Sequence, residues 1–140
     1  MAIERVIEIT AAKERVWATL TDVERWPEWT ASMMSVRRLD QGQFRVGSRA
    51  HIRQPRLPVA TWAVTVLDPG HYFEWQSSAF GLRTIAGHRV AATGDRASRV
   101  TLWVTWRGLL APVVRVLYGK LARRYVAMEA QGLKRRCEAA

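Results

Sequence analysis

The chain has 140 residues, a length that suits one domain with a sizeable core and is too short for two. Hydrophobic residues make up 49% of it and charged residues 24%, which is typical of a globular protein and excludes a disordered one. Twenty-two Lys and Arg against twelve Asp and Glu give a net charge of +10, and the single cysteine, Cys137, excludes an intrachain disulfide framework.

The distribution of charge bears on partners and on location. A basic protein attracts polyanions, but the basic residues are scattered and the only run of three is Lys134 to Arg136. We therefore do not expect nucleic-acid binding, whereas contact with an acidic membrane surface stays open. No apolar run approaches the length of about 20 residues that a membrane-spanning helix needs. Charges in residues 1–5 do not fit a signal peptide, so we expect a cytoplasmic protein.

The N-terminal region reads as one strand and two short helices. Isoleucines alternate with other residues over 3–9, which predicts a half-buried strand. Apolar residues at helical spacing then predict a helix over 12–20. Thr21 and Glu24 have the spacing of a capping box, so a second short helix is expected to begin there, and Pro27 to end it.

The middle of the chain reads as strands with short connections. Asp68-Pro69-Gly70 is a strong turn signal, and Gly94-Asp95 predicts a hairpin. The expected strands cover 33–39, 48–54, 59–67, 71–76, 82–93 and 99–106. Together they predict an antiparallel meander, with the first strand of the chain pairing at one edge.

A long helix is expected at the C-terminal end. Pro112 is acceptable only in a first turn, so the helix should start near Ala111 and run to about Cys137. At 1.5 Å per residue it would be about 40 Å long, enough to span the sheet. Its expected core stripe is Leu110, Val114, Leu117, Leu121, Tyr125 and Met128.

A curved sheet gripping one helix leaves space in the middle of its concave face unless large side chains fill it. Small residues on the expected strand over 82–93 leave room beside the tryptophans of the neighbouring strands, which is typical of an apolar cavity. The predicted lining residues are Trp26, Trp29, Trp62, Val64, Phe73, Trp75, Thr84, Ala86, His88, Leu102, Leu117 and Leu121.

The whole chain resembles the START/SRPBCC superfamily, which includes the birch-pollen allergen, in its polyketide cyclase/dehydrase-like branch. The most specific parts of the resemblance are Val16-Trp17 and Trp26-Pro27-Glu28-Trp29. It implies an α+β helix-grip fold over residues 1–140: a curved seven-stranded antiparallel sheet around a long C-terminal helix, with two short helices after the first strand. Such proteins bind lipids, polyketides and other apolar ligands, and some are cyclases or aromatases.

The leading hypothesis is therefore binding or transport of an apolar small molecule, with no cofactor. One alternative is a polyketide cyclase or aromatase, with His88 as the weak catalytic candidate beside Arg83, Arg89 or Arg107. A second alternative is a protein- or RNA-associated module that uses the basic surface. The histidines lack the paired spacing of a metal site, so no metal is expected. The sequence leaves the oligomeric state open.

Overall fold

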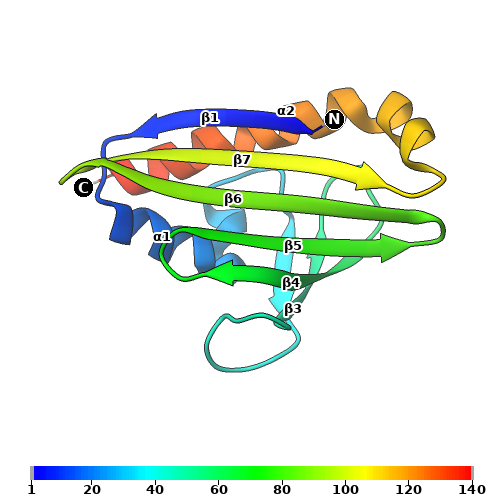
Figure 1. Cartoon of the computed structure of the whole chain (residues 1–140), viewed down its shortest axis with the longest axis horizontal. Helices are drawn as coiled ribbons and strands as arrows, with labels where there is room; N and C mark the ends of the chain where they lie inside the picture. Colours follow the sequence, from blue (N-terminus) through cyan, green and yellow to red (C-terminus); the bar gives the residue numbers. More distant parts are fainter. Residues whose placement is uncertain (1, 140) are drawn as a thin grey trace.

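The computed structural model describes residues 2–139. Over this range the helices and strands follow one another in the order that the sequence predicted (Figure 1). In chain order they are β1 (Ile3–Ile9), α1 (Lys13–Thr21), the 3-10 helix η1 (Val23–Glu28), β2 (Ser35–Arg38), β3 (Arg49–Arg53), β4 (Ala60–Asp68), β5 (Tyr72–Ala79), β6 (Leu82–Gly94), β7 (Ala97–Arg107) and α2 (Ala111–Glu138).

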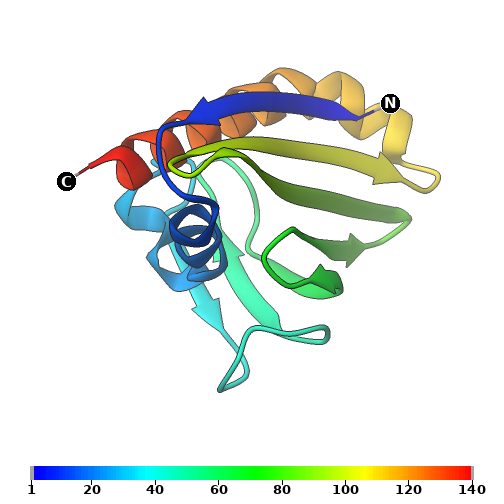
Figure 2. The same cartoon turned by 60° about the vertical axis from the view of Figure 1, so that its left-hand side comes forward.

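The seven strands form one antiparallel sheet in the order β1-β7-β6-β5-β4-β3-β2. The register shifts between Val64 and Val66 and between Ala92 and Gly94, and such bulges increase the local bend of a sheet. Figure 2 shows the curved sheet with α2 running alongside β1, and α1 and η1 near the end where α2 finishes. This is the α+β helix-grip fold, as the sequence predicted.

The two halves of α2 have different environments. In the C-terminal half, Val126, Ala130 and Leu133 are buried in the core. Gly132 lies so close to η1 that a Cβ built on it would be 1.9 Å from the carbonyl oxygen of Trp29. In the N-terminal half, Leu117 is 68% exposed. The predicted stripe is therefore wrong at Leu110 and Leu117, which project into solvent, whereas Val114 between them is half-buried.

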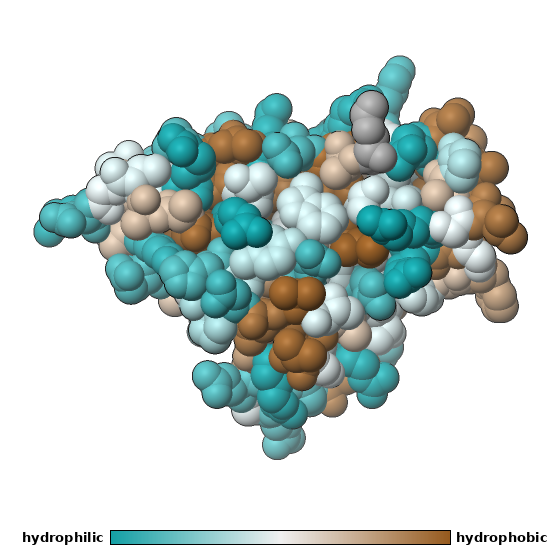
Figure 3. Space-filling view, in the orientation of Figure 1, coloured by the Kyte–Doolittle hydropathy of each residue, from teal (hydrophilic) through white to brown (hydrophobic). Residues whose placement is uncertain are grey.

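Exposed apolar side chains gather where β7 leads into α2 (Figure 3). Phe80, in the turn between β5 and β6, is 97% exposed, and Leu109 is 91% exposed. The two loops are in contact, because the backbone N–H of Leu110 donates to the carbonyl oxygen of Gly81 at 3.1 Å. We call this surface the apolar tip; its members are Phe80, Leu109, Leu110, Val113, Val116 and Leu117.

The predicted capping box is absent. Thr21 Oγ1 donates to the carbonyl oxygen of Trp17 at 2.9 Å, back into its own helix. Glu24 Oε2 instead accepts from the backbone N–H of Arg38 at 2.9 Å, which ties η1 to β2. The spacing is that of a capping box, but in the folded chain Glu24 bonds to the backbone N–H of Arg38 instead of to a backbone N–H at the start of η1. The segment is a 3-10 helix with Pro27 inside it.

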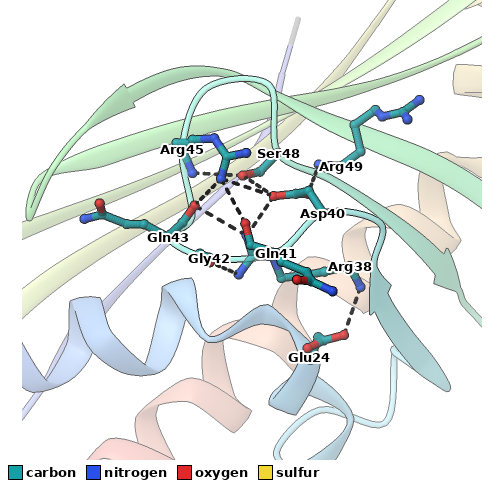
Figure 4. A network of polar contacts seen from close by, with 9 residues as sticks. All are labelled: Glu24, Arg38, Asp40, Gln41, Gly42, Gln43, Arg45, Ser48 and Arg49. Atoms are coloured by element: carbon teal, nitrogen blue, oxygen red, sulfur yellow. Dashed lines mark hydrogen bonds and ion pairs between the residues drawn. The ribbon is translucent and has the colours of Figure 1, made fainter.

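The loop between β2 and β3 is folded around Asp40 (Figure 4). Its two carboxylate oxygens accept from the guanidinium of Arg38, the hydroxyl of Ser48 and the backbone N–H of Arg49, at 2.8 to 3.0 Å. Burial opposes ionisation, but these hydrogen bonds outweigh it and lower the pKa of Asp40. Asp40 thus holds together the hairpin that β2 and β3 form.

Candidate ligand-binding cavity

A cavity of about 300 Å³ lies between the concave face of the sheet, η1, the β3–β4 loop and α2. Its walls are mostly apolar, and large aromatic side chains contribute from five elements: η1, β4, β5, β7 and α2. Those aromatic residues are Trp26, Trp62, Trp75, Trp103, Trp106, Tyr118 and Tyr125. The few polar side chains among them are Gln54, Ser77, Thr84, His88 and Glu129. An apolar space with a few polar groups is the usual form of a small-molecule site.

Eight of the twelve residues predicted from sequence line this cavity: Trp26, Trp62, Trp75, Thr84, Ala86, His88, Leu102 and Leu121. Strand alternation brings most of them together, because every second residue of β5, β6 and β7 points to the same face. Trp26 comes from η1, where its Nε1 donates to the carbonyl oxygen of Leu20 at 2.9 Å. That bond holds the indole in place on the cavity wall.

The other four lie elsewhere. Val64 and Phe73 face the concave side but are covered by neighbouring side chains, and both are buried in the core. Leu117 projects from the apolar tip into solvent. Trp29 is buried beside Trp26, with ring centroids 5.6 Å apart, and borders a different hollow. A strand pattern gives the face of a residue, but not whether other side chains fill the space in front of it.

The hollow beside Trp29 is larger, about 440 Å³, but it is open to solvent. It is lined by residues 27–31 of η1 and the following turn, and by Gly132, Arg135 and Arg136 of α2. Because no wall encloses it on the solvent side, a small molecule there would keep much of its surface in water. The cavity on the concave face of the sheet is less open to solvent and is therefore the better candidate site.

His88 is a buried, neutral imidazole. Its ring stacks on Phe73 with centroids 4.1 Å apart, and Nδ1 lies 3.2 Å from the carbonyl oxygen of Phe73. A carbonyl oxygen only accepts, so Nδ1 carries the hydrogen and Nε2 keeps the lone pair. Burial lowers the pKa of His88 to about 4, and the bond to Phe73 only partly opposes this. Near pH 7 the ring can accept a hydrogen bond but carries no charge.

Glu129 is the polar residue that the sequence reasoning missed. It lies on α2 one turn beyond Tyr125, and it borders the cavity. None of the described residues makes a hydrogen bond or an ion pair with its carboxyl group. Burial raises the pKa of Glu129 to about 8, so the group is largely protonated near neutral pH. The spacing of Leu121, Tyr125 and Glu129, four residues apart, places them on one face of a helix, so the sequence contained the information needed to predict Glu129 as a lining residue.

The cavity contains no basic side chain from the described part of the chain, although the protein has 22 Lys and Arg. Arg83, Arg89 and Arg107, which the cyclase alternative invoked, are all exposed. They occupy the odd positions of β6 and β7 and so lie on the outer face, where Arg89 stacks over the ring of Tyr72 at 4.4 Å. That part of the hypothesis is wrong.

One contact closes the cavity on the side of the β3–β4 loop. The hydroxyl of Tyr125 donates to the carbonyl oxygen of Pro55, and both Leu57 and Pro58 of that loop line the space. On the other side, Tyr118 of the first turns of α2 lines it beside the apolar tip. Among residues 2–139 no group of three or more His, Cys, Asp or Glu side chains is arranged to hold a metal ion.

Comparison with known proteins identifies the family. Residues 1–138 match the family model described as polyketide cyclase / dehydrase and lipid transport. The chain belongs to this family. A comparison of its sequence with curated proteins finds no match.

Solved structures of this fold are similar over nearly the full chain. TTHA0849 from Thermus thermophilus is 18% identical, with a TM-score of 0.77, and 98% of this chain and 97% of that one are covered. A START superfamily protein from Mycobacterium smegmatis is 15% identical, with a TM-score of 0.77 and coverage of 98% and 97%. The Zhui aromatase/cyclase from Streptomyces sp. R1128 is 17% identical, with a TM-score of 0.74 and coverage of 99% and 93%. At these identities the likeness concerns the fold alone.

Proposed function

We propose that this protein binds and carries an apolar small molecule, such as a lipid, a polyketide or an aromatic compound, in the cavity between the concave face of the sheet and α2. The observation that carries the proposal is the cavity of about 300 Å³ whose lining includes seven large aromatic side chains. Burying a ligand there removes apolar surface from water on both partners, at about 25 cal/mol per Å². The family description, which includes lipid transport, agrees with it.

The cyclase alternative has less support from the cavity. Acid–base catalysis needs titratable groups that converge on the reacting atoms. Among residues 2–139, the hydrogen bond and the ring contacts of His88 are with Phe73, Trp26 and Trp75, none of which is titratable. Glu129 lines the same cavity from α2, but it makes no hydrogen bond or ion pair with His88. The arginines that would polarise a ligand carbonyl face outward. The Zhui protein, one of the similar solved structures, is an aromatase/cyclase, which is a statement about that protein.

The apolar tip suggests how a water-insoluble ligand enters. It surrounds the first turns of α2, whose residues Val114 and Tyr118 line the cavity. Residues 96–128 contain seven Lys and Arg and no Asp or Glu. Exposed apolar side chains flanked by positive charge suit the surface of an anionic bilayer. We propose that the tip touches such a surface transiently while ligand passes. No helix among residues 2–139 has the length and apolar character to cross a bilayer.

The binding proposal is tested by filling the cavity. Ala86 lines it on β6, whereas Ala91 lies exposed on the outer face of the same strand. In Ala86→Phe the new ring occupies part of the cavity, so the affinity for the neutral fluorescent probe N-phenyl-1-naphthylamine should fall at least tenfold. The matched control Ala91→Phe should bind the probe as the wild type does. Melting temperatures measured in parallel show whether either variant is unfolded.

Native mass spectrometry of freshly purified protein gives a second readout, because a tightly held natural ligand travels with the chain. The Ala86→Phe variant should carry less of it. If the wild type binds no apolar probe and carries no small molecule, or if both phenylalanine variants bind alike, the proposed function is wrong.

A further inference from the structure

We propose that the ligand of this cavity carries a basic amine, whose ammonium group pairs with the carboxylate of Glu129 while its apolar part lies among the tryptophans. The inference rests on the proposed function and narrows it to a chemical class. It is carried by the position of Glu129, a carboxyl group on the cavity wall that has no partner among the described residues.

Glu129 is half-buried, and a carboxyl group that a ligand shuts off from water is costly unless it receives a hydrogen bond or a counter-ion. Here α2 presents Glu129 to the cavity, and the neighbouring titratable groups that also line it are His88 from β6 and Tyr118 and Tyr125 from α2 itself. The hydroxyl of Tyr125 is engaged by Pro55, and the Nδ1 hydrogen of His88 by Phe73. None of the other described lining residues donates to Glu129 either, so its carboxyl group is open to a donor from the ligand.

The charges of the cavity disfavour the other ligand classes. An anionic ligand would meet a carboxyl group and no Lys or Arg among the described lining residues. A wholly apolar ligand would leave Glu129 buried without a partner, at a cost of about 1–3 kcal/mol or more. A cation gains twice, because the carboxylate attracts it and the faces of Trp and Tyr rings attract positive charge. The net charge of +10 opposes approach of a cation only at long range, where salt screens it.

Amine binding has a proton balance that distinguishes it. In the empty cavity Glu129 is largely protonated near pH 7, because burial raises its pKa to about 8. A ligand ammonium that pairs with the carboxylate displaces that proton, which goes to the buffer, while the ammonium keeps its own. The affinity for an amine should therefore rise between pH 6 and pH 8, by up to tenfold per pH unit, and binding should release about one proton at the lower pH.

The test uses two probes of equal size, 1-naphthylmethylamine and 1-naphthylmethanol, each displacing N-phenyl-1-naphthylamine from the wild type and from Glu129→Gln. Glutamine has the shape of the protonated carboxyl group but cannot ionise. At pH 8 the amine should bind the wild type at least tenfold more tightly than the alcohol, and Glu129→Gln should remove that preference by weakening the amine at least tenfold relative to the alcohol. Calorimetry of the wild type in buffers of different ionisation enthalpy counts the released proton and needs no variant.

The inference is overturned if the wild type binds amine and alcohol alike, if Glu129→Gln weakens both to the same degree, or if amine binding releases no proton. Preference for the alcohol would show that the protonated carboxyl donates to a neutral acceptor instead. In all these cases N-phenyl-1-naphthylamine still binds and the proposed function stands. If neither the reporter nor the naphthalenes bind, the proposed function itself has failed.

Discussion

The packing of α2 on η1 makes a sharp prediction about two glycines of the same helix. A Cβ at Gly132 would lie 1.9 Å from the carbonyl oxygen of Trp29, whereas a Cβ at Gly119 would meet nothing within 4 Å. An ordinary contact between these atom types is about 3.3 Å, so Gly132→Ala requires helix and backbone to separate by about 1.4 Å. Gly119→Ala requires no movement.

The magnitudes follow from two effects. Replacing glycine by alanine inside a helix stabilises by about 1 kcal/mol, and this gain is common to both variants. Only Gly132→Ala adds an overpacking cost of about 1–3 kcal/mol or more, since a backbone carbonyl cannot move aside as a flexible side chain does. The difference between the variants therefore measures the clash alone. At roughly 4 °C per kcal/mol for a chain of this size, Gly132→Ala should melt about 4–12 °C below Gly119→Ala.

Thermal denaturation followed by circular dichroism measures both midpoints, and urea titration gives the free energies of unfolding. Gly119→Ala should melt above the wild type by about 4 °C. Equal melting temperatures for the two variants would refute the close approach of α2 to Trp29. The same result would also remove the basis for the position of Glu129, which lies one turn before Gly132.

Two further predictions concern stability and the apolar tip. Burial raises the pKa of Glu129 from 4.5 to about 8, so the unfolded chain loses this proton first as the pH rises, and stability falls between those values. Glu129→Gln should therefore stabilise the protein by about 2–4 kcal/mol at pH 8.5 and by little at pH 5. The exposed control Glu4→Gln should change the free energy of unfolding little at either pH. Equal effects of Glu129→Gln at the two pH values would contradict the raised pKa. For the tip, the protein should sediment with phosphatidylglycerol vesicles and not with phosphatidylcholine vesicles. Phe80→Ser combined with Leu109→Ser should abolish that, and undiminished sedimentation would show that charge alone drives the contact.

The order of the elements was predictable from the sequence because it depends on local patterns. Alternating isoleucines predicted β1, and Asp68-Pro69-Gly70 predicted the turn between β4 and β5. Pro112 predicted the start of α2 to within two residues. Strand parity also placed Ala86 and His88 on the concave face. Each of these inferences needs only the dihedral preferences and side-chain directions of neighbouring residues.

Only the tertiary structure decided which residues on the correct face reach the cavity. Phe73 and Val64 share the face of Trp75 and Trp62 but are covered by other side chains, and Leu117 projects into solvent. Glu24 does not cap η1 as expected but accepts a hydrogen bond from the backbone N–H of Arg38, which lies 14 residues away in the chain. Glu129 gains its raised pKa from walls contributed by several distant segments. Burial and electrostatics depend on every element that meets at a point, and no local pattern contains that information.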